Sequence, residues 1–141
     1  MEKIISINNL SIAFSKYTEV VKNVNIDVVK GKTTAIVGES GSGKTLSALS
    51  ILKLLPSGAS IKTGEIRYNN KNLLNLSQKE IQNIRGNKIS TIFQEPMTSL
   101  NPLHTINKQI EEIITTHKTI SKKESKERTI ELLNEVGLSD I

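Results

Sequence analysis

The sequence predicts an α/β fold in which a glycine-rich loop joins a buried strand to a helix. Three observations predict it: apolar residues alternate over residues 3–29, a loop with three glycines spans residues 38–45, and helical spacing dominates the second half. The chain has 141 residues, enough for one domain. Because it contains four aromatic residues and no Trp, its core must consist of Ile, Leu and Val.

The N-terminal part is expected to be an antiparallel sheet. Apolar and polar residues alternate over residues 3–14 and 20–29, which predicts two paired strands. Residues 33–37 are β-branched and apolar with little alternation, a pattern typical of a strand buried on both faces. Residues 64–68 predict a further strand, and the two asparagines that follow them predict a turn.

Helix signals follow the glycine-rich loop. Residues 46–55 have leucines at helical spacing until Pro56 interrupts them. Ser77 and Glu80 form a capping box, in which a hydroxyl and a carboxylate satisfy each other's backbone N–H groups, so a short helix is expected to run to about Arg85.

The second half is expected to begin with an inner strand and to continue as helices. Residues 88–93 have the apolar content of an inner strand, and the two prolines in residues 94–102 make the next loop stiff. Residues 106–117 and 122–136 have helical periodicity, and Ser121 with Glu124 forms a second capping box.

Composition excludes several kinds of site. Without cysteine the chain has no disulfide, zinc–thiolate site or thiol nucleophile, which fits a reducing, intracellular compartment. No stretch approaches the ~20 apolar residues that span a bilayer, and the N-terminus is expected to be a strand, not a signal peptide. The net charge of +5 is spread over both halves and comes mainly from Lys, so nucleic-acid binding is not expected.

The glycine-rich loop matches the phosphate-binding pattern G-x-x-x-x-G-K-[ST] at all four fixed positions. Its residues are Gly38, Glu39, Ser40, Gly41, Ser42, Gly43, Lys44 and Thr45. Glycines let the backbone wrap an anion closely, the helix N-terminus adds positive charge, and Lys44 reaches the β- and γ-phosphates while the Thr45 hydroxyl binds Mg²⁺. Glu39 and Ser40 are expected to shape the loop. A structural turn with a solvated lysine is the alternative, but it does not explain all four fixed residues.

Two segments together resemble a known family. Residues 38–45 read G-E-S-G-S-G-K-T, and residues 92–102 read I-F-Q-E-P-M-T-S-L-N-P. The chain closely resembles the ATP-binding subunits of ABC transporters, in particular the peptide/nickel (oligopeptide/dipeptide) import subfamily. The resemblance implies a P-loop NTPase of the ABC ATPase type with an N-terminal antiparallel β-subdomain and the start of the helical subdomain. It divides this partial domain into a β-subdomain and phosphate-loop core (1–93), a Q-loop (94–102) and the beginning of the helical subdomain (103–141).

The resemblance also implies residue roles. Gln94 matches the catalytic glutamine of the Q-loop, whose amide helps to hold Mg²⁺ and the attacking water. Phe14 lies where the family has an aromatic that stacks on adenine, with Tyr17 as second choice. Without the family, Gln94 reads equally well as an ordinary polar loop residue and Phe14 as a core aromatic.

Several motifs of a complete ATPase of this class are not found in these 141 residues. The only aspartates, Asp27 and Asp140, do not follow an apolar run and are not followed by Glu, and no two glycines are adjacent. His104 and His117 do not match the family's switch histidine. The sequence therefore predicts the N-terminal portion of the domain, through truncation, a split gene or an experimental fragment, without ATP turnover of its own.

The expected function is that of an ATP-binding subunit, or its truncated remnant, that couples ATP binding and hydrolysis to import of peptides or similar solutes. The alternative is a nucleotide-binding fragment without hydrolysis, regulatory or non-functional. Expected cofactors are ATP and Mg²⁺. Expected partners are membrane permease subunits at residues 94–101 and a second ATP-binding subunit in the full-length form, with no nucleic acid. The expected location is cytoplasmic, peripheral on the inner face of the cell membrane.

Overall fold

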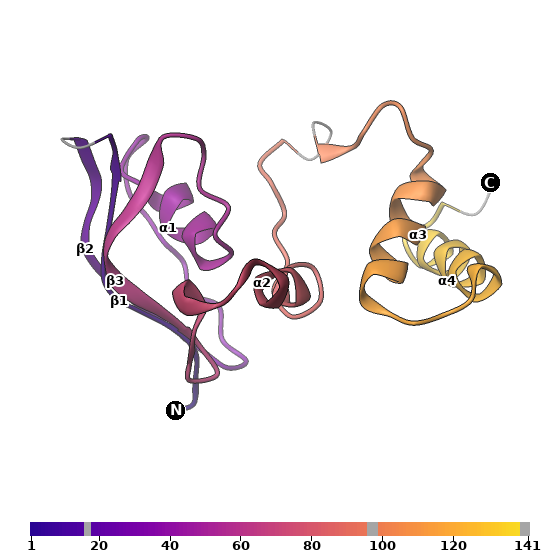
Figure 1. The fold of residues 1–141 in the computed structure, drawn as a ribbon, viewed down its shortest axis with the longest axis horizontal. Coiled ribbons are helices and arrows are strands. Elements are labelled where there is room, and N and C mark those ends of the chain that lie inside the picture. The colour runs from indigo at the N-terminus through magenta and orange to yellow at the C-terminus, as the bar shows by residue number, and fades with distance from the viewer. Residues whose placement is uncertain (16–17, 96–98, 139–141) are drawn as a thin grey trace. The chain divides into compact units, whose positions relative to one another are not determined.

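The computed structural model describes residues 1–15, 18–95 and 99–138. It contains two compact units, Met1–Arg85 and Gly86–Ile141, which are described separately (Figure 1). The first unit contains a sheet and two α-helices, and the second contains two further α-helices. Within the described residues no helix is long and apolar enough to cross a membrane.

The sheet of the first unit has four antiparallel strands in the order β2-β1-β3-β4. They are β1 (Lys3–Phe14), β2 (Thr18–Val29), β3 (Ala59–Tyr68) and β4 (Lys71–Asn72). Alternation places apolar side chains opposite one another, so that Ile7 of β1 pairs with Ile26 of β2 and with Ile66 of β3. The predicted early strands, their antiparallel pairing and the strand before the asparagine turn are confirmed.

Helices pack against this sheet in the first unit (Figure 1). α1 (Lys44–Ile51) contacts β1, and the short 3₁₀-helix η1 (Leu73–Asn75) contacts β3. The third helix of this unit is α2 (Gln78–Ile84). The buried core combines sheet residues with residues from these helices and the turn after α1: Ile7, Leu10, Ile12, Ala13, Val21, Leu52, Ile66, Leu73 and Ile81. Aliphatic side chains thus form the core, as the shortage of aromatics predicts.

The predicted strand at residues 33–37 is not formed. These residues carry no ladder hydrogen bonds, and all of them are exposed, Val37 to 92%. The four described strands pair with one another, and none of them forms a ladder with this segment. A strand needs a partner backbone as well as a suitable sequence, so the apolar run alone did not suffice.

The predicted inner strand at residues 88–93 is also wrong. Only an isolated bridge at Ile89 is present, next to a turn in which the Gly86 N–H donates to the Ile89 carbonyl at 2.9 Å. Ile92 is 93% exposed and Phe93 is 46% exposed. No described strand pairs with this segment, so its apolar content does not lead to burial.

The second unit consists mainly of α3 (Ile106–His117) and α4 (Lys122–Glu135), as predicted. The capping box of Ser121 and Glu124 begins α4, and that of Ser77 and Glu80 begins α2 in the first unit, so both capping predictions are confirmed. α3 and α4 pack against each other, and the buried residues of α4 are Ser125, Thr129 and Leu133.

Candidate functional site

The glycine-rich loop leads directly into the N-terminus of α1. Gly43 is the N-cap residue in a left-handed conformation (φ +88°), and no side chain of the described residues caps this helix end. The Ser42 N–H donates to the Glu39 carbonyl at 3.2 Å, which turns the loop back on itself. Because the first N–H groups of a helix have no intrahelical acceptor, this end of α1 presents free donors and a partial positive charge. It is a suitable place for an anion.

Lys44, the first residue of α1, holds its ammonium group over the loop. Nζ donates to the carbonyl oxygens of Gly38 at 2.7 Å and Glu39 at 2.6 Å. A β-carbon added at Gly38 would lie 2.9 Å from the Ser42 hydroxyl oxygen, so the loop closes tightly at this point. The lysine is therefore positioned by the loop itself, where a phosphate group can replace neutral carbonyl partners with a charge-assisted contact.

A hollow of about 340 Å³ opens in front of the loop. Its lining comes from the sheet and from the loop with the start of α1: Phe14, Val20, Gly41, Ser42, Gly43, Lys44, Thr45 and Leu46. The structure thus brings Phe14, at the end of β1, to the same hollow as the phosphate loop. The sequence did not predict Val20 as a lining residue. Val20 reaches the hollow because the β1–β2 pairing places the start of β2 beside the end of β1. Tyr17 lies outside the described residues.

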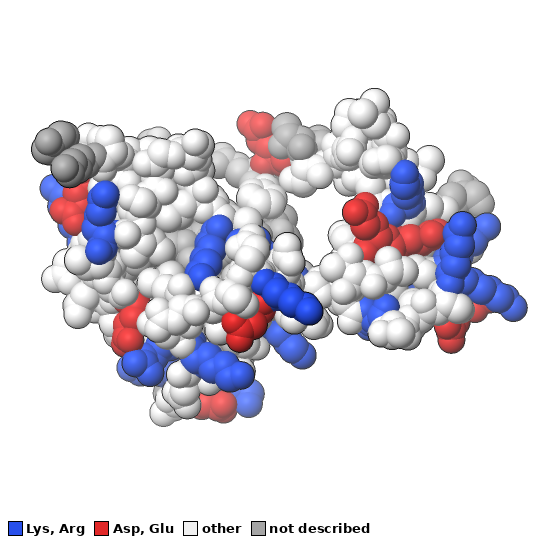
Figure 2. All heavy atoms as spheres, in the orientation of Figure 1, with Lys and Arg blue, Asp and Glu red and all other residues white. Residues whose placement is uncertain are grey.

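The charge of this hollow favours an anion. Lys44 is its one charged lining residue in the part of the chain that the structure describes. Basic and acidic side chains are mixed on the face of the protein shown in Figure 2, so the preference does not come from a broad basic surface there.

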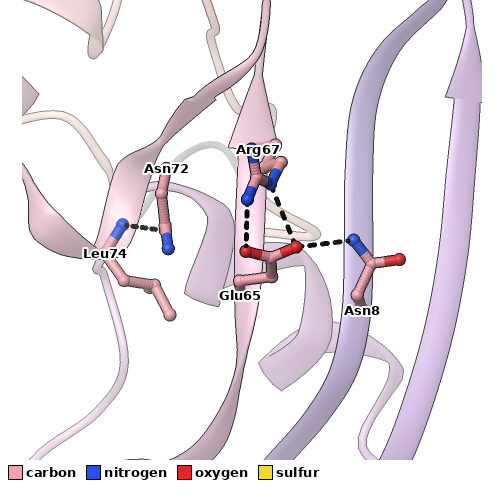
Figure 3. A network of polar contacts seen from close by, with 5 residues as sticks. All are labelled: Asn8, Glu65, Arg67, Asn72 and Leu74. Atoms are coloured by element: carbon pink, nitrogen blue, oxygen red, sulfur yellow. Dashed lines mark hydrogen bonds and ion pairs between the residues drawn. The ribbon is translucent and has the colours of Figure 1, made fainter.

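The carboxylates with clearly lowered pKa are not in the lining of the hollow. On the sheet, the Arg67 guanidinium and the Asn8 amide donate to Glu65, and the pKa of Glu65 is lowered mainly by the hydrogen bonds from Arg67 (Figure 3). Lys3 and then Ser6 lower the pKa of Asp27 in the same way. These carboxylates are occupied in structural pairs, and nothing suggests a catalytic role for them.

The two predicted metal-binding residues are in different units. Thr45 lines the hollow, whereas Gln94 is an exposed residue of the second unit, so its role remains a prediction. The described residues contain no group of three His, Cys, Asp or Glu side chains able to hold a metal. Since Mg²⁺ retains waters and binds substrate phosphates, a single hydroxyl beside a phosphate loop fits a nucleotide-bound Mg²⁺ better than a protein-held one.

The fold and the loop define a P-loop nucleotide-binding domain, and comparison with known proteins places it in a family. Residues 21–141 match the ABC transporter family, and the chain belongs to that family. Among solved structures, the dimeric bacterial ABC transporter cassette MJ0796 has a TM-score of 0.75 at 27% identity, covering 92% of this chain and 56% of that one. CbiO1 from Clostridium perfringens, at 22% identity and a TM-score of 0.71, shares the fold.

Relatives with similar sequences are named as peptidoglycan, oligopeptide and dipeptide transport ATP-binding proteins. The chain is 46% identical to the peptidoglycan transport ATP-binding protein YejF of Agrobacterium fabrum, over 99% of this chain and 26% of the relative. It is 45% identical to the oligopeptide transport ATP-binding protein OppD of Bacillus subtilis, over 96% and 39% respectively. It is 44% identical to the dipeptide transport ATP-binding protein DppD of Bacillus subtilis, over 99% and 43%. The predicted family is confirmed, and the chain spans less than half the length of these relatives.

Proposed function

We propose that this chain is the nucleotide-binding part of an ABC transporter subunit that couples ATP binding and hydrolysis to import of peptides or similar small solutes. The observation that carries the proposal is the hollow in which Phe14, the phosphate loop and the N-terminus of α1 meet. The names of the relatives OppD and DppD support the peptide class.

The phosphates of ATP, the Mg²⁺ bound to them and the adenine base each have a matching group in this hollow. The phosphates meet the free N–H groups at the start of α1 and the ammonium of Lys44. The Thr45 hydroxyl is a ligand for the Mg²⁺ bound to those phosphates. The ring of Phe14 offers a flat apolar surface on which the adenine base stacks, because base–aromatic stacking needs no hydrogen-bond readout. Gly38 to Gly43 supply backbone and turn geometry, with Glu39 and Ser40 shaping the loop.

Calorimetric titration with Mg·ATP tests the phosphate-loop assignment. Lys44→Ala removes the charge from a phosphate contact, so we expect affinity to fall at least about tenfold, which corresponds to roughly 1.4 kcal/mol. Lys32→Ala removes the same charge at an exposed residue that does not line the hollow, and it should bind as the unsubstituted chain does. Unchanged affinity in Lys44→Ala would refute the assignment.

A second candidate function is nucleotide binding without hydrolysis. It is favoured by the two aspartates of the sequence, neither of which is followed by Glu. Phosphoryl transfer to water requires a positioned metal and a water-orienting group, and Gln94 is our proposed candidate for the second role. We expect the 141-residue chain to bind Mg·ATP and release no phosphate above background. Release that Lys44→Ala abolishes would show that these residues are sufficient for turnover.

We also propose that residues 94–101 contact a permease subunit at the inner face of the cell membrane, and that a second ATP-binding subunit pairs with the full-length form. Leu100 in this loop is 43% exposed, and Ser99 beside it is exposed. Met97 lies outside the described residues. A photocrosslinker on Ser99→Cys should label the permease in cells, and one on Asn70→Cys, at an exposed turn of the first unit, should not. Equal labelling would count against the loop as the contact.

A further inference from the structure

The C-terminal end of α1 is held by a side chain from a distant part of the sequence. The Arg85 guanidinium donates from Nε to the Leu52 carbonyl at 2.8 Å and from Nη2 to the Lys53 carbonyl at 3.1 Å. Leu52 is the C-cap of α1, and Lys53, in a left-handed conformation (φ +53°), is the residue after it. Arg85 is itself the C-cap of α2. One arginine therefore joins the ends of two helices.

A second contact strengthens the same junction. The Lys53 ammonium donates to the Leu76 carbonyl at 2.7 Å, and the Leu52 side chain is buried. We call Leu52, Lys53, Leu76 and Arg85 the α1 clasp. Its hydrogen bonds are partly buried, so removing the guanidinium leaves two carbonyl groups without this partner where water reaches them poorly. The positive charge also interacts favourably with the negative end of the α1 dipole.

The clasp matters for the opposite end of α1 because the helix is short. Eight residues at 1.5 Å each make a rod of about 12 Å, with Lys44 and Thr45 in its first turn. The residues that α1 itself buries are Ser47 and Ser50, which are small and contribute little apolar surface. Packing against the sheet therefore fixes the direction of the helix only weakly. The contacts at its C-terminal end contribute correspondingly more to holding that direction.

We propose that Arg85 is a positioning residue for the nucleotide site. It holds α1 in the direction at which the first-turn N–H groups and the Lys44 ammonium converge on the phosphates. The inference rests on the proposed nucleotide-binding function but concerns a residue outside the hollow, since Arg85 is not among the residues that line it. Its role is exerted through α1, so its loss should change affinity for Mg·ATP in chains that are still folded.

Calorimetric titration of the full 141-residue chain tests this at a temperature where circular dichroism shows each variant to be folded. We expect Arg85→Ala to weaken Mg·ATP binding about fivefold, roughly 1 kcal/mol. Arg85→Lys keeps the positive charge and a single ammonium donor group. Its affinity for Mg·ATP should therefore lie between those of the unsubstituted chain and Arg85→Ala. If Arg85→Ala does not fold, Arg85→Lys replaces it in the test. Arg67→Ala is the matched control, because it removes an arginine of the same unit whose two hydrogen bonds go to Glu65 instead (Figure 3).

The outcomes separate the two proposals. If Lys44→Ala binds Mg·ATP as well as the unsubstituted chain does, the proposed function fails. If Lys44→Ala weakens binding but folded Arg85→Ala and Arg85→Lys do not, the positioning role of Arg85 is overturned. The role is also overturned if Arg67→Ala weakens binding as much as Arg85→Ala, because the effect is then one of net charge.

Discussion

Gly43 is a position where an added methyl group should be damaging for two separable reasons. Its φ of +88° costs an L-residue about 1–2 kcal/mol. In addition, a β-carbon would lie 2.6 Å from Cγ2 of Val21, a side chain that is only 2% exposed and so has little room to retreat. Such overpacking typically costs a further ~1–3 kcal/mol. Gly41, at φ +78°, has nothing within 4 Å of an added β-carbon and bears only the backbone cost.

Urea unfolding of the two alanine variants measures the difference. We expect Gly43→Ala to lower the free energy of unfolding by ~1–3 kcal/mol more than Gly41→Ala does. It should also weaken Mg·ATP binding at least about tenfold, since the N-cap of α1 must shift. The double variant Gly43→Ala/Val21→Ala removes the clashing methyl, so its cost should be less than the sum of the single costs. Equal stability of the two single variants would refute the steric reasoning.

Two further predictions concern the base and the helix cap. Phe14→Ala should weaken ATP binding about fivefold or more, because base–aromatic stacking is worth ~1–3 kcal/mol per base. Binding of tripolyphosphate, which has no base, should be unchanged. Calorimetry with both ligands measures this, and an equal loss of affinity for both would contradict stacking. Ser77→Ala should cost about 1 kcal/mol of stability through loss of the α2 N-cap. Hydrogen bonds from the Ser77 hydroxyl and backbone N–H lower the pKa of Glu80, so the stability they add is present above the ordinary pKa of a glutamate and is lost as pH falls through the lowered value. Ser77→Ala removes the hydrogen bond from the hydroxyl to the Glu80 carboxylate, so urea unfolding at decreasing pH should show the difference between the two chains narrowing in acid. The hydrogen bond from the Glu80 N–H to the hydroxyl does not depend on the carboxyl charge, so part of the difference should remain.

The features that the sequence predicted correctly depend on local patterns, either within one helical turn or in two consecutive strands. The glycine-rich loop leads directly into α1, as predicted, with Gly43 as the N-cap residue. The capping box of Ser77 and Glu80 closes over a single helical turn. Alternation within residues 3–14 and 20–29 predicts strands that pair through a short connection. The partner groups lie within one helical turn or in two strands joined by a short connection, so the local pattern predicts the contact.

The features that it missed depend on distant partners. Residues 33–37 and 88–93 have the composition of inner strands, but composition does not provide the neighbouring backbone that a strand requires. Val20 reaches the hollow only through strand pairing, and Arg85 reaches the Leu52 carbonyl across 33 positions of sequence. No sequence pattern around an arginine that follows a short helix predicts such a contact. Only the fold shows it.

The exposed segment at residues 33–37 leads to a prediction about association of the chain. Ile36 is 43% exposed and Val37 is 92% exposed, in a segment that forms no ladder with any described strand. Such a segment is a template for pairing with a second copy. Burying a fully exposed aliphatic side chain contributes ~1.5–3 kcal/mol, and Ile36 is already more than half buried, so the two from each copy together contribute about 4–8 kcal/mol. Association itself costs ~4–15 kcal/mol, so the balance predicts weak, concentration-dependent dimers.

Sedimentation velocity over a range of protein concentrations measures this association. Val37→Lys places a charge in the exposed segment at residues 33–37 and should shift the chain toward monomer. Leu103→Lys is the control, because Leu103 is 87% exposed in the second unit and its substitution tests whether any exposed apolar side chain gives the same result. If Leu103→Lys disperses the protein as well as Val37→Lys does, association is not specific to this segment. A monomer at every concentration, with a sharp and reversible unfolding transition, would show that residues 33–37 do not drive association. The free-energy cost of association would then exceed the free energy gained by burying Ile36 and Val37.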